Sequence, residues 1–275
     1  MRVNTASKLL PALAALLGLL ALAASSGAAG RIGVGRMIVT PVLVTAASTG
    51  NELVFTFNAD SAALVGRTIV DVPVGWSPPQ RSNPTGAGYV ELQRESCSSS
   101  TRLLKIAGRR ITIATACGHR HFFRLLYHKA TAPHFSADGY VFLTQTRSAA
   151  GGRRRTTFRP LDPHKQPVVR VRGGAATALF MTTTSVAVSG TPFNATVRAV
   201  DPYGNNATGY PGTAVTLTTT DPAASLPAPY AYGTTDGAQH TFTGLVLRTP
   251  GTQRITATDS AGRSVTSGPI TVSAS

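Results

Sequence analysis

The sequence predicts an all-β protein, in which two tandem β-sandwiches follow an N-terminal signal peptide. Apolar residues alternate with polar ones over short segments, which is the period of a half-buried strand. Turn-forming Pro, Gly, Asn and Asp residues separate these segments at regular intervals. Glu, Lys and Gln, which usually fill the exposed faces of helices, are scarce. Together these observations favour sheets over helices throughout the chain.

Residues 1–29 have the order of a secretory signal peptide. Arg2 and Lys8 precede an apolar run over residues 9–24, and small residues follow up to Ala29. The run of 16 residues is shorter than the roughly 20 that a membrane-spanning helix needs, and no second run of that length follows. We therefore expect cleavage between Ala23 and Ala29 and a mature chain without an integral membrane span. It would be secreted or loosely associated with the cell surface.

The C-terminal half shows the clearer strand pattern. Apolar residues occupy every second position of 193–199, and the turn Asp201-Pro-Tyr-Gly-Asn-Asn206 follows. The alternation recurs at 215–217, 242–247, 255–257 and 270–272, with turn signals such as Asp221-Pro222 between the segments. Short strands with regular turns are typical of a sandwich of antiparallel sheets.

Three motifs in this half carry a resemblance. They are Val197-Arg-Ala-Val-Asp-Pro-Tyr-Gly-Asn205, Ala207-Thr-Gly-Tyr-Pro-Gly-Thr213 and Pro250-Gly-Thr-Gln-Arg-Ile-Thr-Ala-Thr-Asp259. Residues 176–275, almost end to end, resemble the immunoglobulin-like repeat of bacterial cell-surface and secreted proteins. The resemblance implies an immunoglobulin-like β-sandwich. It does not select a function, because such modules serve as spacers, adhesin stalks and enzyme appendages alike.

Residues 36–172 are predicted to form the other, basic β-sandwich. Its expected strands are 38–44, 53–57, 68–72, 89–92, 110–115, 121–127, 140–144 and 168–171. The phrases Thr49-Gly-Asn-Glu-Leu-Val-Phe-Thr-Phe57 and Val72-Pro-Val-Gly-Trp-Ser-Pro-Pro-Gln80 are similar to another β-sandwich type of secreted bacterial repeat proteins. A basic, histidine-rich insert departs from those uncharged repeats. Gly173-Gly-Ala-Ala176 joins the two predicted domains, which span 36–172 and 176–275.

The two cysteines, Cys97 and Cys117, are predicted to form a disulfide. An even number of cysteines in an exported chain favours this interpretation. A closed loop of about 20 residues stabilises the fold by about 3 kcal/mol through the unfolded state. The short spacing indicates that the bond ties neighbouring strands or a loop.

The run Cys117-Gly-His-Arg-His-Phe-Phe-Arg-Leu-Leu-Tyr-His-Lys129 raises two hypotheses. In a strand, Phe123, Leu125 and Tyr127 share the core face, and Arg120 and Arg124 lie on the other. His119 and His121 would then be placed to chelate zinc or copper. Because a disulfide removes the Cys117 thiolate and a structural site needs about four ligands, a strand is favoured over a metal site.

The positive charge is concentrated in the N-terminal half. Residues 94–172 hold 16 basic and 3 acidic side chains, whereas residues 173–275 hold four of each and are neutral. A basic surface could bind a polyanion such as a cell-wall polymer, an acidic polysaccharide or extracellular nucleic acid, with Phe122 and Tyr127 available for stacking. The candidate residues are Arg120, Arg124, Arg153, Arg154, Arg155 and Arg159. A solvated hairpin tip at 151–155 is the alternative.

No catalytic set and no cofactor site can be named from the residues. The chain has no Gly-x-Ser-x-Gly, His-Glu-x-x-His or P-loop motif. An exported, non-catalytic structural or adhesin-like binding module is therefore the favoured function. A carbohydrate-binding appendage that uses Trp76, Tyr89 or Tyr140 and an enzyme with an unrecognised site remain as alternatives.

Overall fold

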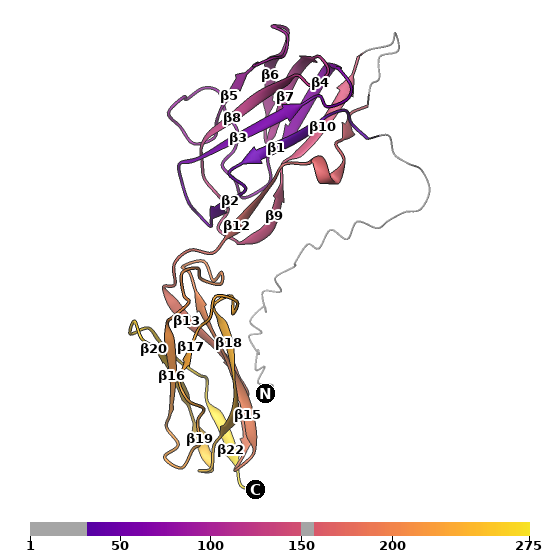
Figure 1. Ribbon diagram of the computed structural model, residues 1–275. Helices are drawn as coiled ribbons and strands as arrows, with labels where there is room; N and C mark the ends of the chain where they lie inside the picture. The colour runs from indigo at the N-terminus through magenta and orange to yellow at the C-terminus, as the bar shows by residue number, and fades with distance from the viewer. Residues whose placement is uncertain (1–31, 150–156) are drawn as a thin grey trace, which may run out of the picture. The chain divides into compact units, whose positions relative to one another are not determined.

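The computed structural model describes residues 32–149 and 157–275; the predicted signal peptide and Arg153, Arg154 and Arg155 lie outside them. The described residues form 22 β-strands and one short 3-10 helix, η1 (Pro163–Lys165). Within these ranges no helix has the length and apolar character that crossing a bilayer requires. The predicted all-β fold is confirmed (Figure 1).

Residues 36–172 form three sheets around one hydrophobic cluster. The four-stranded sheet has the order β1 (Arg36–Thr40), β3 (Asn51–Asn58), β8 (Phe122–Ala130), β5 (Tyr89–Gln93). The five-stranded sheet has the order β11 (Arg159–Pro160), β10 (Leu143–Ser148), β4 (Leu64–Asp71), β7 (Arg110–Cys117), β6 (Arg102–Ala107). A small sheet joins β2 (Leu43–Thr45), β12 (Val168–Arg172) and β9 (Ala137–Val141).

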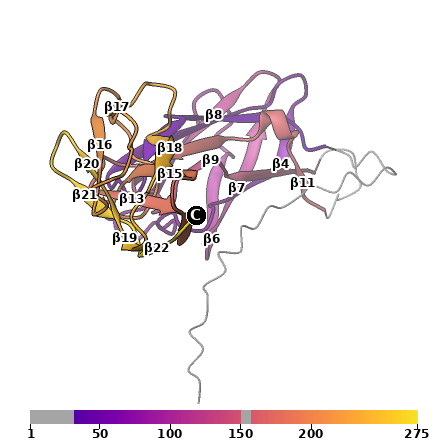
Figure 2. The same ribbon diagram turned by 90° about the horizontal axis from the view of Figure 1, so that it is seen from below.

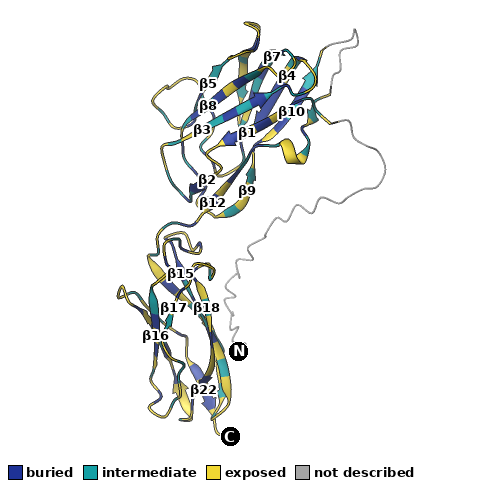
Figure 3. Ribbon diagram, viewed as in Figure 1, coloured by how far each residue is buried: buried dark blue, intermediate teal, exposed yellow. Residues whose placement is uncertain are grey.

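The core of this half lies between the two large sheets. Phe123, Leu125 and Tyr127 of β8 are buried, as their alternation predicts, and Phe123 stacks on Phe57 with ring centroids 5.0 Å apart. The other sheet contributes the side chains at alternate positions of β7, including Ile111. The strands of this half accordingly alternate between buried and exposed residues in Figure 3.

Residues 178–273 form three further sheets around a second hydrophobic cluster. Their orders are β13 (Ala178–Thr183), β15 (Pro192–Val200), β18 (Gln239–Val246); then β14 (Val186–Val188), β22 (Ile270–Ser273), β19 (Gly251–Gln253); and β17 (Tyr230–Ala231), β16 (Ala214–Thr219), β20 (Ile255–Asp259), β21 (Ser264–Thr266). Figure 2 views these elements from below. Ala195, Val197 and Ala199 of β15 are fully buried, as the period of two predicts.

Three strand expectations for the N-terminal half need correction. The segment 140–144 is divided at Phe142 between the end of β9 and the start of β10, which belong to different sheets. The segment 38–44 is broken into β1 and β2, because Pro41 has no N–H to continue a ladder. Residues 102–107, which were not predicted as a strand, form β6 at the edge of the five-stranded sheet. A bulge between Leu103 and Lys105 interrupts the alternation by which β6 would be recognised.

Candidate functional site

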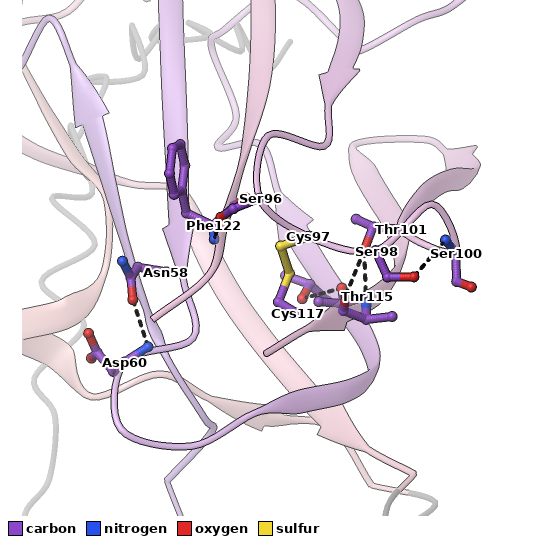
Figure 4. Close-up of a disulfide and its surroundings, with 12 residues drawn as sticks. Asn58, Asp60, Ser96, Cys97, Ser98, Ser100, Thr101, Thr115, Cys117 and Phe122 are labelled. Carbon is purple, nitrogen blue, oxygen red and sulfur yellow. Dashed lines mark hydrogen bonds between the residues drawn. A yellow bond between two sulfur atoms is a disulfide. The ribbon is translucent and has the colours of Figure 1, made fainter. Parts of the chain in front are cut away.

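The predicted disulfide ties the connection between β5 and β6 to the end of β7. Cys97 and Cys117 are bonded, with their Cα atoms 4.5 Å apart (Figure 4). Beside the bond, the Ser98 N–H donates to the Ala116 carbonyl at 2.9 Å, and the buried Thr101 Oγ1 accepts from the Ala116 N–H at 3.0 Å. Because Arg102 follows Thr101 directly, these bonds fix the start of β6 against β7.

Arg120 lines an open hollow of about 490 Å³ together with other cationic side chains. The hollow is lined by Arg36, Asn58, Asp60, Ser61, His119, Arg120 and Lys165. Asp60 lies among them, with its carboxylate 3.3 Å from Arg36 Nε and 3.1 Å from Lys165 Nζ. Arg120 makes no side-chain ion pair within the described residues. We call this group the basic hollow.

Two turns with left-handed residues shape the basic hollow. Asp60 has φ 53° and Arg120 has φ 61°, and the Arg120 N–H donates to the Asp60 carbonyl at 3.0 Å. The Asn58 side chain accepts from the Asp60 N–H at 2.7 Å, which closes the first turn. This backbone hydrogen bond joins the two turns and holds Arg120 beside Asp60.

Arg124 is engaged by a neighbouring carboxylate. It points outward from β8, its Nη1 donates to Glu95 at 2.9 Å, and its guanidinium lies 5.7 Å from the Phe122 ring centre. Further along β8, His128 Nδ1 lies 2.6 Å from Glu52. The outward face of the four-stranded sheet thus places carboxylates beside its cations.

Arg159, which the sequence also predicted as a polyanion contact, is not among the residues that line the basic hollow. Arg159 belongs to the two-residue edge strand β11, opposite Thr146 of β10. Arg36 in the basic hollow was missed by sequence reasoning, because β1 meets β8 only through β3 and no local motif joins Arg36 to Arg120. Lys165 of η1 completes the basic hollow, and no local motif joins it to Arg120.

The histidine pair precedes β8 instead of lying on one of its faces. His119 and His121 are exposed in the turn between β7 and β8. Within residues 32–149 and 157–275 there is no group of three or more His, Cys, Asp or Glu side chains placed to hold one metal ion.

Two aromatic candidates are not accessible to a ligand. Tyr127 is 1% exposed and its hydroxyl donates to the Ser77 carbonyl, so the expected stacking role is wrong. Trp76 is 2% exposed and packs edge-on against Phe142, which removes it as a sugar platform. Tyr89 stacks on His128 with ring centres 5.8 Å apart, and the Tyr140 hydroxyl donates to the Phe135 carbonyl at 2.9 Å.

Comparison with known proteins gives structural similarity at a low level. No family model matches the sequence, and no curated protein matches it. Similar solved structures are the adhesin InvE of Yersinia pseudotuberculosis (11% identity, 90% of this chain and 61% of that one, TM-score 0.29) and a putative membrane-anchored protein of Corynebacterium diphtheriae (12%, 88% and 54%, 0.30). Invasin, described as a bacterial integrin-binding protein, is similar at 12% identity over 88% of this chain and 39% of that one, with a TM-score of 0.30. The chain spans less than two thirds of each, and likeness at these TM-scores carries no argument about function.

Proposed function

We propose that the chain is an exported, non-catalytic binding or structural module of the cell surface or extracellular space, adhesin-like in kind, and that its N-terminal half contacts polyanions. The proposal takes residues 1–29 as a signal peptide. It takes the two hydrophobic clusters as the cores of two domains, 36–172 and 176–275. The second domain, in which four basic and four acidic residues cancel, would act as a neutral spacer.

The basic hollow is the observation that supports polyanion contact. Arg36, Arg120 and Lys165 meet there around the single carboxylate of Asp60. Asp60 pairs with two of these cations, Arg36 and Lys165, so a net positive charge remains at the opening. An anionic group of a polymer fits this arrangement, since charge-assisted hydrogen bonds to Arg and Lys are the usual means of holding phosphate, sulfate or carboxylate.

Binding of the full chain to heparin, measured at several salt concentrations, tests the proposal. We expect log Kd to change linearly with log salt, and Arg120→Asn to lower the slope by about 0.7 to 0.9, the value of one anionic contact. Asn tolerates the left-handed backbone at this position, so the variant keeps its turn. The matched control is Arg198→Gln, which removes one charge from the neutral half and should leave the slope unchanged. Equal effects of the two variants, or no binding to heparin at low salt, would refute polyanion contact through the basic hollow.

Export is tested separately by the N-terminus of the secreted protein. We expect it to lie between residues 24 and 30, at the small residues that follow the apolar run. An N-terminus at Met1 in the extracellular protein would contradict the signal peptide.

A further inference from the structure

The outward face of the five-stranded sheet brings together basic residues that are distant in sequence. Strand pairing sets Arg147 of β10 opposite Arg67 of β4, Arg67 opposite Ala114 of β7, and Ala114 opposite Arg102 of β6. The neighbouring order of β6, β7, β4 and β10 can be followed in Figure 1. Ile113 and Thr115, on either side of Ala114, are buried, so the Ala114 row points away from the core.

Five basic residues occupy outward positions of this sheet, and we call them the basic face. They are Arg67, Arg102, Lys105, Arg110 and Arg147. Asp71 is the single acidic residue at these outward positions, and it accepts two hydrogen bonds from Arg110, at 2.7 and 2.8 Å. By contrast, Glu52, Glu91 and Glu95 lie on or beside the four-stranded sheet, near Arg124 and His128. The acidic residues therefore neutralise one sheet and leave the other basic.

The row of arginines places like charges on neighbouring strands. Arg67 faces Arg147 directly, and the Arg147 guanidinium also lies 4.9 Å from the ring centre of Phe158. Neighbouring strands lie about 4.8 Å apart, so Arg67 and Arg102, two strands apart, are separated by about 10 Å. A polymer with closely spaced negative charges contacts several of these side chains together. A sparsely charged polymer meets fewer of them.

The chemistry of the basic face favours phosphate without bases. After Arg110, β7 presents only Thr112, Ala114 and Ala116 outward, and the outward positions of β4, β6 and β10 hold no aromatic side chain. The Phe158 ring beside the row is half-buried and lies under the Arg147 guanidinium, 4.9 Å from its centre. Proteins that bind single-stranded nucleic acid stack its bases on open aromatic rings, which these outward positions do not supply. Four of its five cations are arginines, whose planar fork matches a phosphate group with two hydrogen bonds.

We propose that the basic face binds an unbranched, base-free polymer of phosphate groups, which crosses the strands along the row of Arg147, Arg67 and Arg102. This inference rests on the proposed function, for which it names a second site and a ligand class. The short side chains of β7 let the polymer lie close to the sheet between the arginines. The disulfide and the Thr101 hydrogen bonds hold the Arg102 side of the row in place.

The decisive variant is Ala114→Glu, tested in the full chain with inorganic polyphosphate as the probe. The new carboxylate lies directly opposite both Arg67 and Arg102, where cross-strand pairs of opposite charge are favourable, so the fold is retained while the row is neutralised. Titration calorimetry at about 50 and 200 mM salt should show affinity lowered by about tenfold or more. The slope of log Kd against log salt should fall by about 1.4, which is 0.7 for each of two arginines.

Two control variants show whether the effect of Ala114→Glu comes from charge at this site, from added charge anywhere on the protein or from the bulk of the new side chain. Thr56→Glu adds the same charge on the outward face of the other sheet, also opposite an arginine, Arg124, and should change the affinity less than twofold. Ala114→Gln adds the same bulk without charge and should retain most of the binding. If Thr56→Glu weakens binding as much as Ala114→Glu, attraction is unspecific and the proposal is wrong.

Two further outcomes distinguish this inference from the function on which it rests. If Arg120→Asn weakens polyphosphate binding and Ala114→Glu does not, the basic hollow is the site and the basic face is not. If the wild-type chain binds neither heparin nor polyphosphate, polyanion contact itself is refuted. A thymidine oligonucleotide with the same number of phosphates should bind no more tightly than polyphosphate; tighter binding would overturn the base-free ligand class.

Discussion

The buried carboxylate of Asp221 is expected to make the C-terminal half sensitive to acid. Asp221 follows β16 and is 3% exposed. Its Oδ2 accepts from the N–H groups of Arg248 (2.6 Å) and Thr249 (3.0 Å), and its Oδ1 accepts from the Thr249 hydroxyl (2.6 Å) and the Ala223 N–H (2.9 Å). Burial by itself raises the pKa of this carboxyl. The hydrogen bonds favour the ionised form more strongly and lower the pKa from 3.8 to about 2.

The contribution of Asp221 to stability follows from these two pKa values. At 1.36 kcal/mol for each pH unit between 3.8 in the unfolded chain and about 2 in the folded one, the ionised carboxylate contributes about 2 kcal/mol. Because the folded pKa is the lower one, this contribution is complete above about pH 5 and is lost as the pH falls towards 2. We expect Asp221→Asn to lower the free energy of unfolding by about 2 kcal/mol at pH 7, and this difference to shrink to a small fraction of that value at pH 2.

Urea unfolding followed by far-UV circular dichroism between pH 2 and pH 7 measures the difference. Trp76, the single tryptophan, is buried in the first cluster, so its fluorescence reports the N-terminal half and should shift little. The matched control is Asp138→Asn, because Asp138 is exposed and its carboxylate makes no hydrogen bond or ion pair within the described ranges. A difference between wild type and Asp221→Asn that stays constant from pH 7 to pH 2 would refute the linkage argument.

Two further predictions concern the N-terminal half. Replacing both cysteines, Cys97→Ala with Cys117→Ala, should lower the free energy of unfolding by about 3 kcal/mol, because it opens a loop of 20 residues; an unchanged urea midpoint by Trp76 fluorescence would contradict this. Gly66→Ala should destabilise the same transition by about 1 to 3 kcal/mol, because the new Cβ would lie 2.0 Å from the Arg147 carbonyl oxygen. The control Gly50→Asn has no atom within 4 Å of its Cβ and should have little effect, so equal losses for the two glycines would exclude the steric cause.

Local patterns were sufficient to predict most of the fold. The alternation in β8 correctly assigned Phe123, Leu125 and Tyr127 to the core, and the alternation in β15 did the same for Ala195 and Val197. Short or interrupted strands were missed, such as β6 with its bulge and β14 with three residues. In these segments the period of two extends over too few residues to be distinguished from a loop.

The basic face could not be predicted in the same way, because it depends on long-range pairing. Arg67, Arg102 and Arg147 lie far apart in the sequence and meet only through the register of β4, β7, β6 and β10. Each is one outward residue in its own strand, and none stands in a basic run. The run containing Arg120 and Arg124 was conspicuous, yet Glu95, which neutralises Arg124, precedes that arginine by 29 residues and has no local signal.

Most carboxylates of both halves form hydrogen bonds or ion pairs within the fold, and these contacts determine where positive charge remains on the surface. In the C-terminal half, Asp201, Asp221, Asp236 and Asp259 each accept backbone N–H bonds that close turns. Asp259 also accepts from Tyr210 and pairs with Arg263. Three of the four acids of this half, Asp201, Asp221 and Asp259, are buried. In the N-terminal half, Asp60, Asp71 and Glu95 are taken up by Arg36, Arg110 and Arg124. Acids are few in this half, and the register of the five-stranded sheet places one carboxylate, Asp71, among five outward basic side chains. The charge on the surface of the N-terminal half therefore depends on where its seven acidic side chains lie more than on its number of arginines.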